Sequence, residues 1–304
     1  MARYRRGTTF DEGALVPGLV FLAIEIPFDP RIITIGGVML TWHGLFTAVG
    51  ILAGVQIALW MGRRHGYDED DAYTLALIGI PSGILGARLL FVAEHWSFYS
   101  DTPLQILALT EGGISVWGAV IGGVLGPLLF AWWRHYDIPL GLDIGGTGLI
   151  LGMAVGRLGD LINGEHLAKA TSLPWGVIYT DPDSPAYAHS LLVGAHHPAT
   201  TYEMLGDLVI LGAMLWLKAG PFRYRHGLIF TFFFATYAVM RFFVSFLRVD
   251  SAETFLFNIT WPQLVSLLGA LAMVPTGLVL WRLGERRPAP PPPTRPGRVP
   301  VRKA

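Results

Sequence analysis

The chain has 304 residues and a mean hydropathy of +0.49, with 14% charged against 52% hydrophobic residues. Soluble domains carry about 25% charged residues, so this composition indicates a protein that crosses a membrane several times. The formal net charge is zero, which gives no reason to expect nucleic acid or an acidic partner. Cysteine is absent, which excludes disulfides, cysteine-ligated metals and a thiol nucleophile of the protein's own.

The N-terminal region, residues 1–42, is predicted to be an extracytoplasmic arm. Its apolar run at residues 14–28 is shorter than the about 20 residues that span a bilayer, and Pro17, Glu25 and Pro27 interrupt it. The run lacks a small-residue cleavage site. We therefore predict an interfacial segment rather than a signal peptide or a further span.

Seven apolar windows of spanning length follow the arm. They predict an all-α integral membrane protein with a seven-helix transmembrane domain at residues 43–284. The windows cover residues 43–62, 73–94, 113–133, 141–159, 201–218, 226–247 and 262–281.

The basic residues of the short loops predict the orientation. They concentrate after the first, third and fifth windows and in the Pro-rich tail at residues 285–304, which is predicted to be disordered. Outside the tail they are Arg63, Arg64, Arg134, Lys218, Arg223 and Arg225. This distribution predicts an outer N-terminus and a cytoplasmic C-terminus.

The long segment at residues 160–200 falls on the predicted outer side. Loops longer than about 15 residues are usually functional or disordered. This one contains PWGVIY and SPAYAHS, which favour a small ordered extracytoplasmic head.

Small residues recur at four-residue spacing in two windows, a pattern that lets helices approach closely in lipid. They are Gly118, Gly122, Gly126, Gly148, Gly152 and Gly156.

Most ionisable residues at membrane depth lie toward the predicted outer ends of the windows. Each costs about 3 kcal/mol on insertion scales, so such groups normally face a protein interior or a wet cavity. They are His43, Glu94, His95, Arg157, Glu203, Arg241 and Arg248, and the exceptions are Asp143 and the deeper Arg88. A transport pathway would need polar groups through the full depth, so the pattern favours a site for a phospholipid headgroup.

One face of the sixth window carries two guanidiniums with a phenol and a hydroxyl: Tyr237, Arg241, Ser245 and Arg248. Guanidinium groups bind phosphate oxygens bidentately, so this face suits an anion. Alternatively, Arg241 pairs with Glu203 or Asp160 to join helices, while Arg248 extends to the membrane surface. The residues alone leave both readings open.

The end of the fourth window reads GRLGDLINGEH, residues 156–166. An arginine like Arg157, taken alone at the outer end of a span, is more often a membrane-surface anchor than a ligand. Asp160, Asn163 and Glu165 follow it closely, and Asn163-Gly164 is a strong turn signal. The group predicts a turn at the outer membrane surface and a pocket for a headgroup there.

Six motifs of the chain resemble, in order, those of the bacterial prolipoprotein diacylglyceryl transferases. The resemblance covers residues 28–282. The motifs are FDPRIITIGGVMLTWHGL, ILGARLLFV, EGGISVWGAVIGG, GRLGDLINGE, HHPATTYE and YAVMRFFVSFLR.

The resemblance implies an activity. The family transfers the diacylglyceryl group of phosphatidylglycerol to the lipobox cysteine thiol of preprolipoproteins, forming a thioether and releasing glycerol phosphate. It implies phosphatidylglycerol and lipobox signal peptides as partners, and a bacterial inner or plasma membrane location with the site toward the outer leaflet. The sequence has no metal-ligand spacing, and we expect neither metal nor cofactor.

The resemblance also implies residue roles. Arg157 matches the arginine that binds the headgroup, and Arg241 matches an essential arginine with Tyr237 beside it. The expected catalytic set is Arg157, Arg241, Tyr237, His43, Asp160 and Glu165. The expected headgroup-binding set is Arg157, Asn163, Gly164, Arg241, Trp117 and Arg88.

Several positions depart from the family pattern. Asp160 replaces an asparagine and adds negative charge near a phosphodiester, which should weaken binding unless an arginine neutralises it. His43 replaces a tyrosine, Ser245 replaces a glutamate, and Trp117 occupies a position where some members carry a histidine proposed as a base. The base therefore stays open between His43, Asp160 and Glu165. The rival functions are a non-catalytic lipid-binding paralogue and a small anion transporter.

Overall fold

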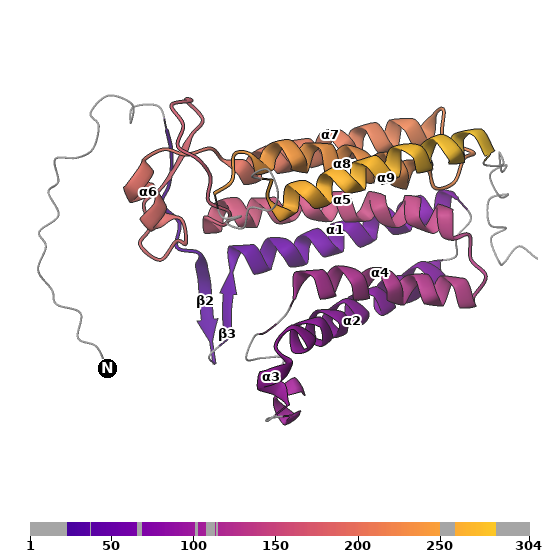
Figure 1. The fold of residues 1–304 in the computed structure, drawn as a ribbon, viewed down its shortest axis with the longest axis horizontal. Helices are drawn as coiled ribbons and strands as arrows, with labels where there is room; N and C mark the ends of the chain where they lie inside the picture. Colours follow the sequence, from indigo (N-terminus) through magenta and orange to yellow (C-terminus); the bar gives the residue numbers. More distant parts are fainter. Residues whose placement is uncertain are drawn as a thin grey trace, which may run out of the picture. The chain divides into compact units, whose positions relative to one another are not determined.

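The computed structural model describes residues 23–36, 38–65, 69–100, 103–107, 113, 115–249 and 259–283. The described chain is mostly helical (Figure 1). Its long helices are α1 (Trp42–Arg64), α2 (Glu69–Glu94), α4 (Val116–Trp133), α5 (Ile138–Asn163), α7 (Ala199–Ala219), α8 (Leu228–Ser245) and α9 (Trp261–Leu283). The shorter elements are the strands β1 (Ile24–Ile26), β2 (Arg31–Ile35), β3 (Val38–Thr41) and β4 (Val177–Tyr179), and the helices α3 (Trp96–Tyr99), η2 (Pro103–Leu107) and α6 (Tyr187–Val193).

Six of the described helices are long and apolar enough to cross a membrane: α1, α2, α5, α7, α8 and α9. They indicate a multi-pass membrane protein and coincide with six of the seven predicted windows. The remaining window, at residues 113–133, coincides with α4, whose described apolar stretch, Ile121–Trp133, is shorter.

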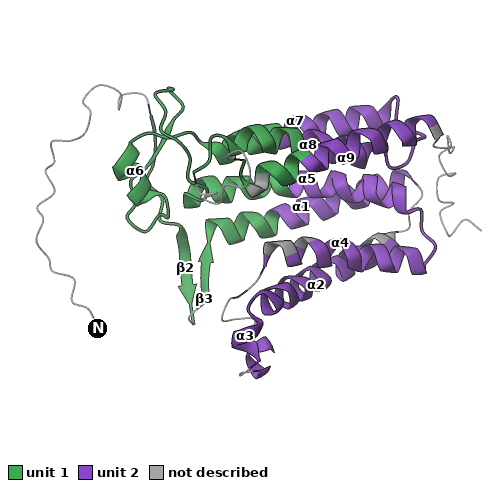
Figure 2. Ribbon diagram, in the orientation of Figure 1, with its two compact units in different colours: residues 1–49, 153–206, 238–267 green, residues 50–152, 207–237, 268–304 purple. Residues whose placement is uncertain are grey.

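The chain divides into two compact units, coloured separately in Figure 2. Unit 1 comprises residues 1–49, 153–206 and 238–267, and unit 2 comprises residues 50–152, 207–237 and 268–304. Helices α1, α5, α7, α8 and α9 each contribute residues to both units.

Close helix packing in unit 2 depends on glycine. A Cβ atom added at Gly50 would lie 2.6 Å from the carbonyl oxygen of Gly152, and one at Gly54 would lie 2.5 Å from that of Gly148. No side chain fits there, so α1 and α5 touch backbone to backbone. The predicted packing role is confirmed for five of the six glycines, including those of α4 against α2. Gly156 is the exception, because a Cβ there would meet nothing within 4 Å.

Unit 2 also contains a buried ion pair. Asp143 of α5 accepts a hydrogen bond from Lys218 Nζ at 2.9 Å, and both side chains are buried. The carboxylate also accepts the backbone N–H groups of Gly227 and Phe230, at 3.1 and 2.9 Å. These N–H groups lie at the first turn of α8 and have no partners within the helix. Asp143 therefore joins α5 to the start of α8.

Unit 1 contains the described strands. β1 pairs with β4 in parallel, and β2 pairs with β3 antiparallel. A small core lies under the first pair, with partly buried Leu161 and Leu167 packed against Ile26, Val177, Tyr179 and Ala186. The segment between α5 and α7, where the sequence predicted a head, thus contains β4 and α6. The position of this segment outside the membrane stays a prediction.

Two predicted helix ends were wrong. α5 continues to Asn163 rather than ending at residue 159, so Asp160 lies on the helix, as Arg157 does, and not in a turn. Helix α5 stops because Gly164 adopts a φ of 82°, and the N–H groups of Gly164 and Glu165 both donate to the carbonyl of Asp160. The predicted turn at Asn163-Gly164 is confirmed.

The sixth window was predicted to continue to residue 247, but α8 ends at Ser245. Arg248 therefore lies beyond the helix and not on one helical face with Arg241. It forms an antiparallel bridge with Ala168, and the flanking N–H of Val249 donates to Leu167. Most of the predicted N-terminal arm and the C-terminal tail, residues 1–22 and 284–304, lie outside the described residues.

Candidate functional site

Glu203 is the centre of a cluster of ion pairs in unit 1. It lies in the first turns of α7, and its side chain is 1% exposed. Oε2 lies 2.6 Å from Arg157 Nη2, and Oε1 pairs closely with Arg241 Nη1. Arg248 Nη1 lies 3.6 Å from Oε1. One buried carboxylate thus contacts three guanidinium groups from three different segments of the chain.

A second carboxylate, Asp160, is joined to the first through Arg157. Arg157 Nη1 donates to Asp160 Oδ2 at 2.7 Å, so this guanidinium bridges Asp160 and Glu203. Asp160 Oδ1 lies 2.6 Å from His43 Nδ1, and His166 Nε2 lies 3.7 Å from Oδ2. The last two turns of α5 therefore supply both an arginine and a carboxylate to one network.

The cluster has an excess of positive charge. Three guanidinium groups face two carboxylates, which leaves one positive charge when the imidazoles are neutral. The side chains of Arg157 and Arg241 remain 16% and 18% exposed. Buried charges require partners, and the carboxylates fix the guanidinium groups while leaving part of their surface accessible. This arrangement suits a singly charged phosphate diester.

The two readings of Arg241 and Arg248 can now be compared with the structure. The pairing of Arg241 with Glu203 is confirmed, and the partial exposure of Arg241 leaves the anion reading open. The expectation that Arg248 extends to the membrane surface was wrong. Its side chain is 6% exposed, and its Nη2 donates to His166 Nδ1 at 2.6 Å. The chain reversal after α8 turns Arg248 inward.

The start of α1 positions His43. Thr41 Oγ1 caps the helix by accepting the N–H of Gly44 at 3.1 Å. The backbone N–H of His43 donates to Asn163 Oδ1 at 3.3 Å. A Cβ at Gly159 would lie 2.8 Å from His43 Cα, so only glycine lets α5 approach α1 this closely. The His43 side chain is 51% exposed, the most accessible member of the network.

The predicted residues Asn163, Gly164 and Glu165 lie at the end of α5. Asn163 is buried, and its Nδ2 donates to Glu165 Oε1 at 3.4 Å. Ser184 Oγ donates to the carbonyl of Asn163 at 3.0 Å. A Cβ at Gly164 would collide with Ser184 Oγ, which adds a steric reason for glycine to its positive φ.

Comparisons with known proteins point to one family. The family model described as prolipoprotein diacylglyceryl transferase matches residues 30–281. A relative from Nostoc sp. is 32% identical over 269 residues, which cover 86% of this chain and 92% of the relative. Relatives from Corynebacterium efficiens and Clostridioides difficile are 34% and 31% identical, covering 80% and 78% of this chain and 79% and 90% of the relatives. All three are named phosphatidylglycerol–prolipoprotein diacylglyceryl transferase.

This chain belongs to the prolipoprotein diacylglyceryl transferase family. The resemblance inferred from six motifs is thereby confirmed, and the protein is a membrane-bound transferase of lipoprotein biosynthesis.

Three residues of the transferase's cluster were absent from the predicted site: Glu203, Arg248 and His166. Glu203 carried a usable signal, because it ends the motif HHPATTYE and was named as a possible partner of Arg241. The sequence suggested only that Glu203 pairs with Arg241 to join two helices, so its position between three guanidinium groups was missed. Arg248 was considered as part of an anion-binding face or as a surface anchor, and His166 ends the stretch GRLGDLINGEH, but no local pattern predicted their contact, which joins residues 82 positions apart.

The remaining predicted binding or catalytic residues are Tyr237, Trp117 and Arg88. Tyr237 lies one helical turn before Arg241 in α8, within the residues of unit 2, and its ring packs at 6.0 Å from that of Phe233. Trp117 lies in α4, and its side chain is outside the described part of the transferase.

Arg88 also lies in unit 2. Its guanidinium donates to the carbonyls of Ile106 and Gly113 at 2.8 and 2.7 Å, and to that of Gln105. It lines a cavity of about 440 Å³ together with Phe91, His95, Phe98, Tyr99, Gln105 and Gly113. These contacts support the segment after α2, while its role toward the headgroup stays a prediction.

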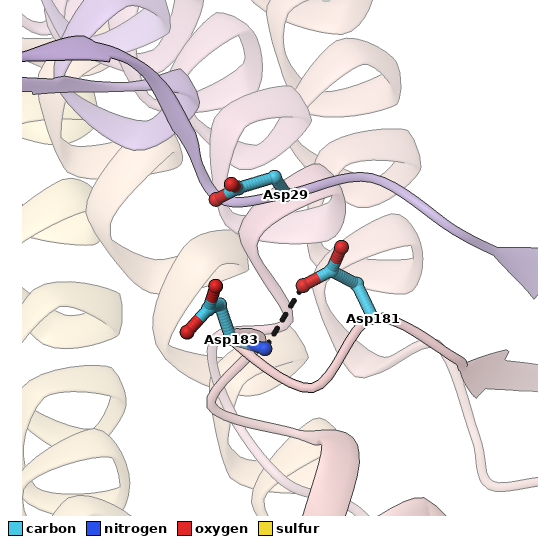
Figure 3. Close-up of side chains that lie close together, drawn as sticks. All are labelled: Asp29, Asp181 and Asp183. Carbon is cyan, nitrogen blue, oxygen red and sulfur yellow. Dashed lines mark hydrogen bonds between the residues drawn. The ribbon is translucent and has the colours of Figure 1, made fainter.

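Three carboxylates from two distant segments of the chain form an acidic cluster outside the ion-pair network. Their oxygen atoms lie within 4.8 Å of one another, close enough to hold a metal ion. Figure 3 shows Asp29, Asp181 and Asp183 facing one another, with the N–H of Asp183 donating to Asp181 Oδ1 at 2.9 Å. Arg31 pairs with both Asp29 and Asp183. The hydrogen bonds from Arg31 hold the pKa of Asp29 below its ordinary value. Arg31 thus neutralises part of the cluster and links β2 to the segment after β4.

A neutral histidine stabilises the segment between α5 and α7. His196 is buried, its ring stacks on Tyr179 at 5.7 Å, and its backbone pairs with Val177. Burial lowers the pKa of His196 to about 4 and raises that of Tyr179. The Tyr179 hydroxyl donates to the carbonyl of Leu161 at 2.6 Å, so this aromatic pair holds the end of α5 in place.

Proposed function

We propose that this transferase moves the diacylglyceryl group of phosphatidylglycerol to the lipobox cysteine thiol of prolipoproteins, forming a thioether and releasing glycerol phosphate. The names of its relatives support the two substrates. The observation that carries the proposal is the set of three guanidinium groups around the single buried carboxylate of Glu203.

The excess positive charge matches the single negative charge of the phosphodiester. When the bond from phosphate to the glyceryl carbon breaks, the leaving phosphate gains a second negative charge. Preorganised donors that face such developing charge usually give the largest catalytic contribution. We assign this role to Arg157 and Arg241, which are partly accessible, and we assign to Glu203 the task of orienting them.

The negative charge of Asp160 does not argue against phosphate binding. Its Oδ2 accepts a hydrogen bond from Arg157 at 2.7 Å, which neutralises the carboxylate that the sequence introduces beside the headgroup site.

We further propose that Asn163 and Gly164 form the wall of this site, and that Tyr237, Trp117 and Arg88 contribute to binding or orienting the lipid. The thiol needs a base, for which His43, Asp160 and Glu165 are the candidates.

For the architecture, we propose seven spans at residues 43–284, an outer arm at residues 1–42, an outer head at about residues 160–200 and a cytoplasmic tail at residues 285–304. The site would face the outer leaflet of the bacterial inner or plasma membrane. In support, the cluster draws on the start of α1, the end of α5, the start of α7 and the later part of α8. If successive spans cross the membrane in alternating directions, the starts of the first and fifth spans (α1 and α7) and the ends of the fourth and sixth (α5 and α8) lie at the same membrane face. The basic loop residues lie at the opposite helix ends.

The decisive experiment is complementation of a bacterial strain depleted of its own transferase, with mass spectrometry of a lipoprotein N-terminus. We expect a diacylglyceryl thioether on the lipobox cysteine. If well-expressed protein modifies no cysteine, the proposal is wrong. Binding of phosphatidylglycerol without any thioether would instead support the non-catalytic paralogue. This alternative is considered because His43, Asp160 and Ser245 depart from the family pattern.

A further inference from the structure

His43 and Asp160 lie 117 positions apart in the chain and meet in unit 1. His43 Nδ1 is 2.6 Å from Asp160 Oδ1. We propose that they form an imidazole–carboxylate pair in which His43 Nε2 takes the proton of the lipobox thiol and Asp160 holds the ring. This inference rests on the proposed function and assigns the base that the function leaves open.

The contact defines which ring nitrogen can act. A carboxylate only accepts hydrogen bonds, so the proton between the two residues belongs to His43 Nδ1. In the neutral ring the other nitrogen, Nε2, then carries the lone pair that can accept a proton. A buried carboxylate that orients a histidine in this way also stabilises the imidazolium that forms when the proton is taken.

Asp160 is held from its other side as well. Its side chain is buried, Arg157 Nη1 donates to Oδ2 at 2.7 Å, and His166 Nε2 lies 3.7 Å from the same oxygen. The carboxylate therefore cannot rotate away from His43 without losing its pair with Arg157. The backbone of His43 is held as well, by its hydrogen bond to Asn163 Oδ1 and by its close approach to Gly159.

Accessibility distinguishes His43 from the other titratable groups nearby. Its side chain is 51% exposed, whereas Asp160 is buried and already accepts two donors. His166 is less exposed, and its Nδ1 accepts a hydrogen bond from Arg248. Glu165 accepts a hydrogen bond from Asn163 Nδ2 at 3.4 Å. His43 is thus the member of the network best exposed to a peptide thiol.

The proposed step balances in atoms and charge. His43 Nε2 takes the thiol proton, and the resulting thiolate attacks the glyceryl carbon that carries the phosphate. The new carbon–sulfur bond forms as the carbon–oxygen bond breaks, and its electron pair stays on the phosphate oxygen beside Arg157 and Arg241. Imidazolium His43 then returns its proton to the phosphate monoester or to water.

A change of nucleophile tests this role. Transfer is measured by mass spectrometry in phosphatidylglycerol vesicles, with one lipobox peptide carrying cysteine and an otherwise identical peptide carrying selenocysteine. A selenol is ionised at neutral pH and needs no base, whereas a free thiol has a pKa of about 8.5. The ratio of the two rates on one preparation does not depend on the fraction of protein that is folded.

For His43→Gln we expect transfer to the cysteine peptide to fall about 100-fold or more, which is the usual contribution of a positioned base. The selenocysteine peptide should recover most of that loss, and Asp160→Asn should show the same selectivity. Arg157→Ala should be slow with both peptides. His65→Gln, at the other end of α1 with its Nδ1 on the carbonyl of Met61, should behave as the wild type.

Two results would overturn the assignment of the base. One is a near-wild-type rate of His43→Gln with the cysteine peptide. The other is an equal loss with both peptides, which would indicate that His43 serves only to build the site. If the wild type transfers lipid to neither peptide, the proposed function itself is wrong, and that outcome is distinct from the first two.

Discussion

The two units differ in how they accommodate buried carboxylates (Figure 2). In unit 2, Asp143 faces one cation, Lys218, and its remaining hydrogen bonds go to the backbone N–H groups of Gly227 and Phe230. In unit 1, Glu203 and Asp160 share three guanidinium groups, two of which remain partly exposed. The first arrangement is neutral and closed, while the second has an excess cation and an accessible surface.

The comparison separates a structural ion pair from a binding site. A buried ion pair whose hydrogen bonds are all formed mainly holds its helices together. Removing one of the two charges leaves the other buried without a partner, which is strongly destabilising. An unbalanced cluster can still bind an anion, because its guanidinium groups are preorganised and not fully used. Variants of the Asp143–Lys218 pair should therefore change stability, whereas variants in the unit 1 cluster should change transfer.

The largest expected effect concerns the closed pair. Lys218→Met leaves Asp143 buried without its cation and should lower the free energy of unfolding by about 3–5 kcal/mol. Unfolding in detergent measures this loss, and transfer per folded molecule should stay unchanged. The double variant Asp143→Asn with Lys218→Met should regain much of the stability. Unchanged stability of Lys218→Met would show that the pair is not structural.

The next effect concerns the open cluster. Arg241→Ala removes a donor to the leaving phosphate and should slow transfer about 10²–10³-fold while the protein still inserts and folds. Arg241→Lys should recover only part of the rate, since an ammonium cannot bind two oxygens in a plane. The exposed Arg223, outside the cluster, provides the control Arg223→Ala. A rate for Arg241→Ala near that of the wild type would remove Arg241 from the mechanism.

His196 is another buried ionisable residue, and it is buried without charge. His196 has a pKa of about 4, while in the unfolded chain it is about 6.5. As the pH falls, the unfolded chain takes the proton first, so the stabilisation is complete above about pH 6.5 and is lost toward pH 4. The loss approaches about 3 kcal/mol.

Hydrogen exchange of the amides in β4 between pH 7 and 4 measures this pH dependence. His196→Asn keeps the backbone pairing with Val177 and removes the titrating ring, so its exchange protection should depend less on pH than that of the wild type. Identical pH profiles for the two proteins would contradict the assignment to His196.

The smallest effect concerns the close contact between α1 and α5 within unit 2. Gly54→Ala places a methyl group against the carbonyl of Gly148, which is backbone and cannot move aside, so the variant should lose about 1–3 kcal/mol. Gly145→Ala is the matched control, because a Cβ there meets nothing within 4 Å. The control should be neutral or up to about 1 kcal/mol more stable from helix propensity. Equal stability of the two variants would contradict the close approach of α1 and α5.

The sequence alone determined the membrane class, six spans and the family. Apolar length, turn residues and short motifs are local properties, and a continuous stretch of chain is enough to reveal them. It also pointed to Arg157, Arg241, His43 and Asp160, which the structure joins in one ion-pair network, since ionisable groups at or near membrane depth are costly and therefore conspicuous. The sequence-based prediction was wrong at the ends of α5 and α8, because these ends depend on hydrogen bonds that the pattern of apolar residues does not reveal.

Only the tertiary structure decided which charges meet. Glu203 contacts Arg157 and Arg241 from two other helices, and His43 contacts Asp160 across 117 positions. The sequence did not show that Asp143 has one cation partner and Glu203 three, because these partners lie on other segments of the chain. The number of cations around a carboxylate, and how far they remain exposed, depends on the packing of separate helices.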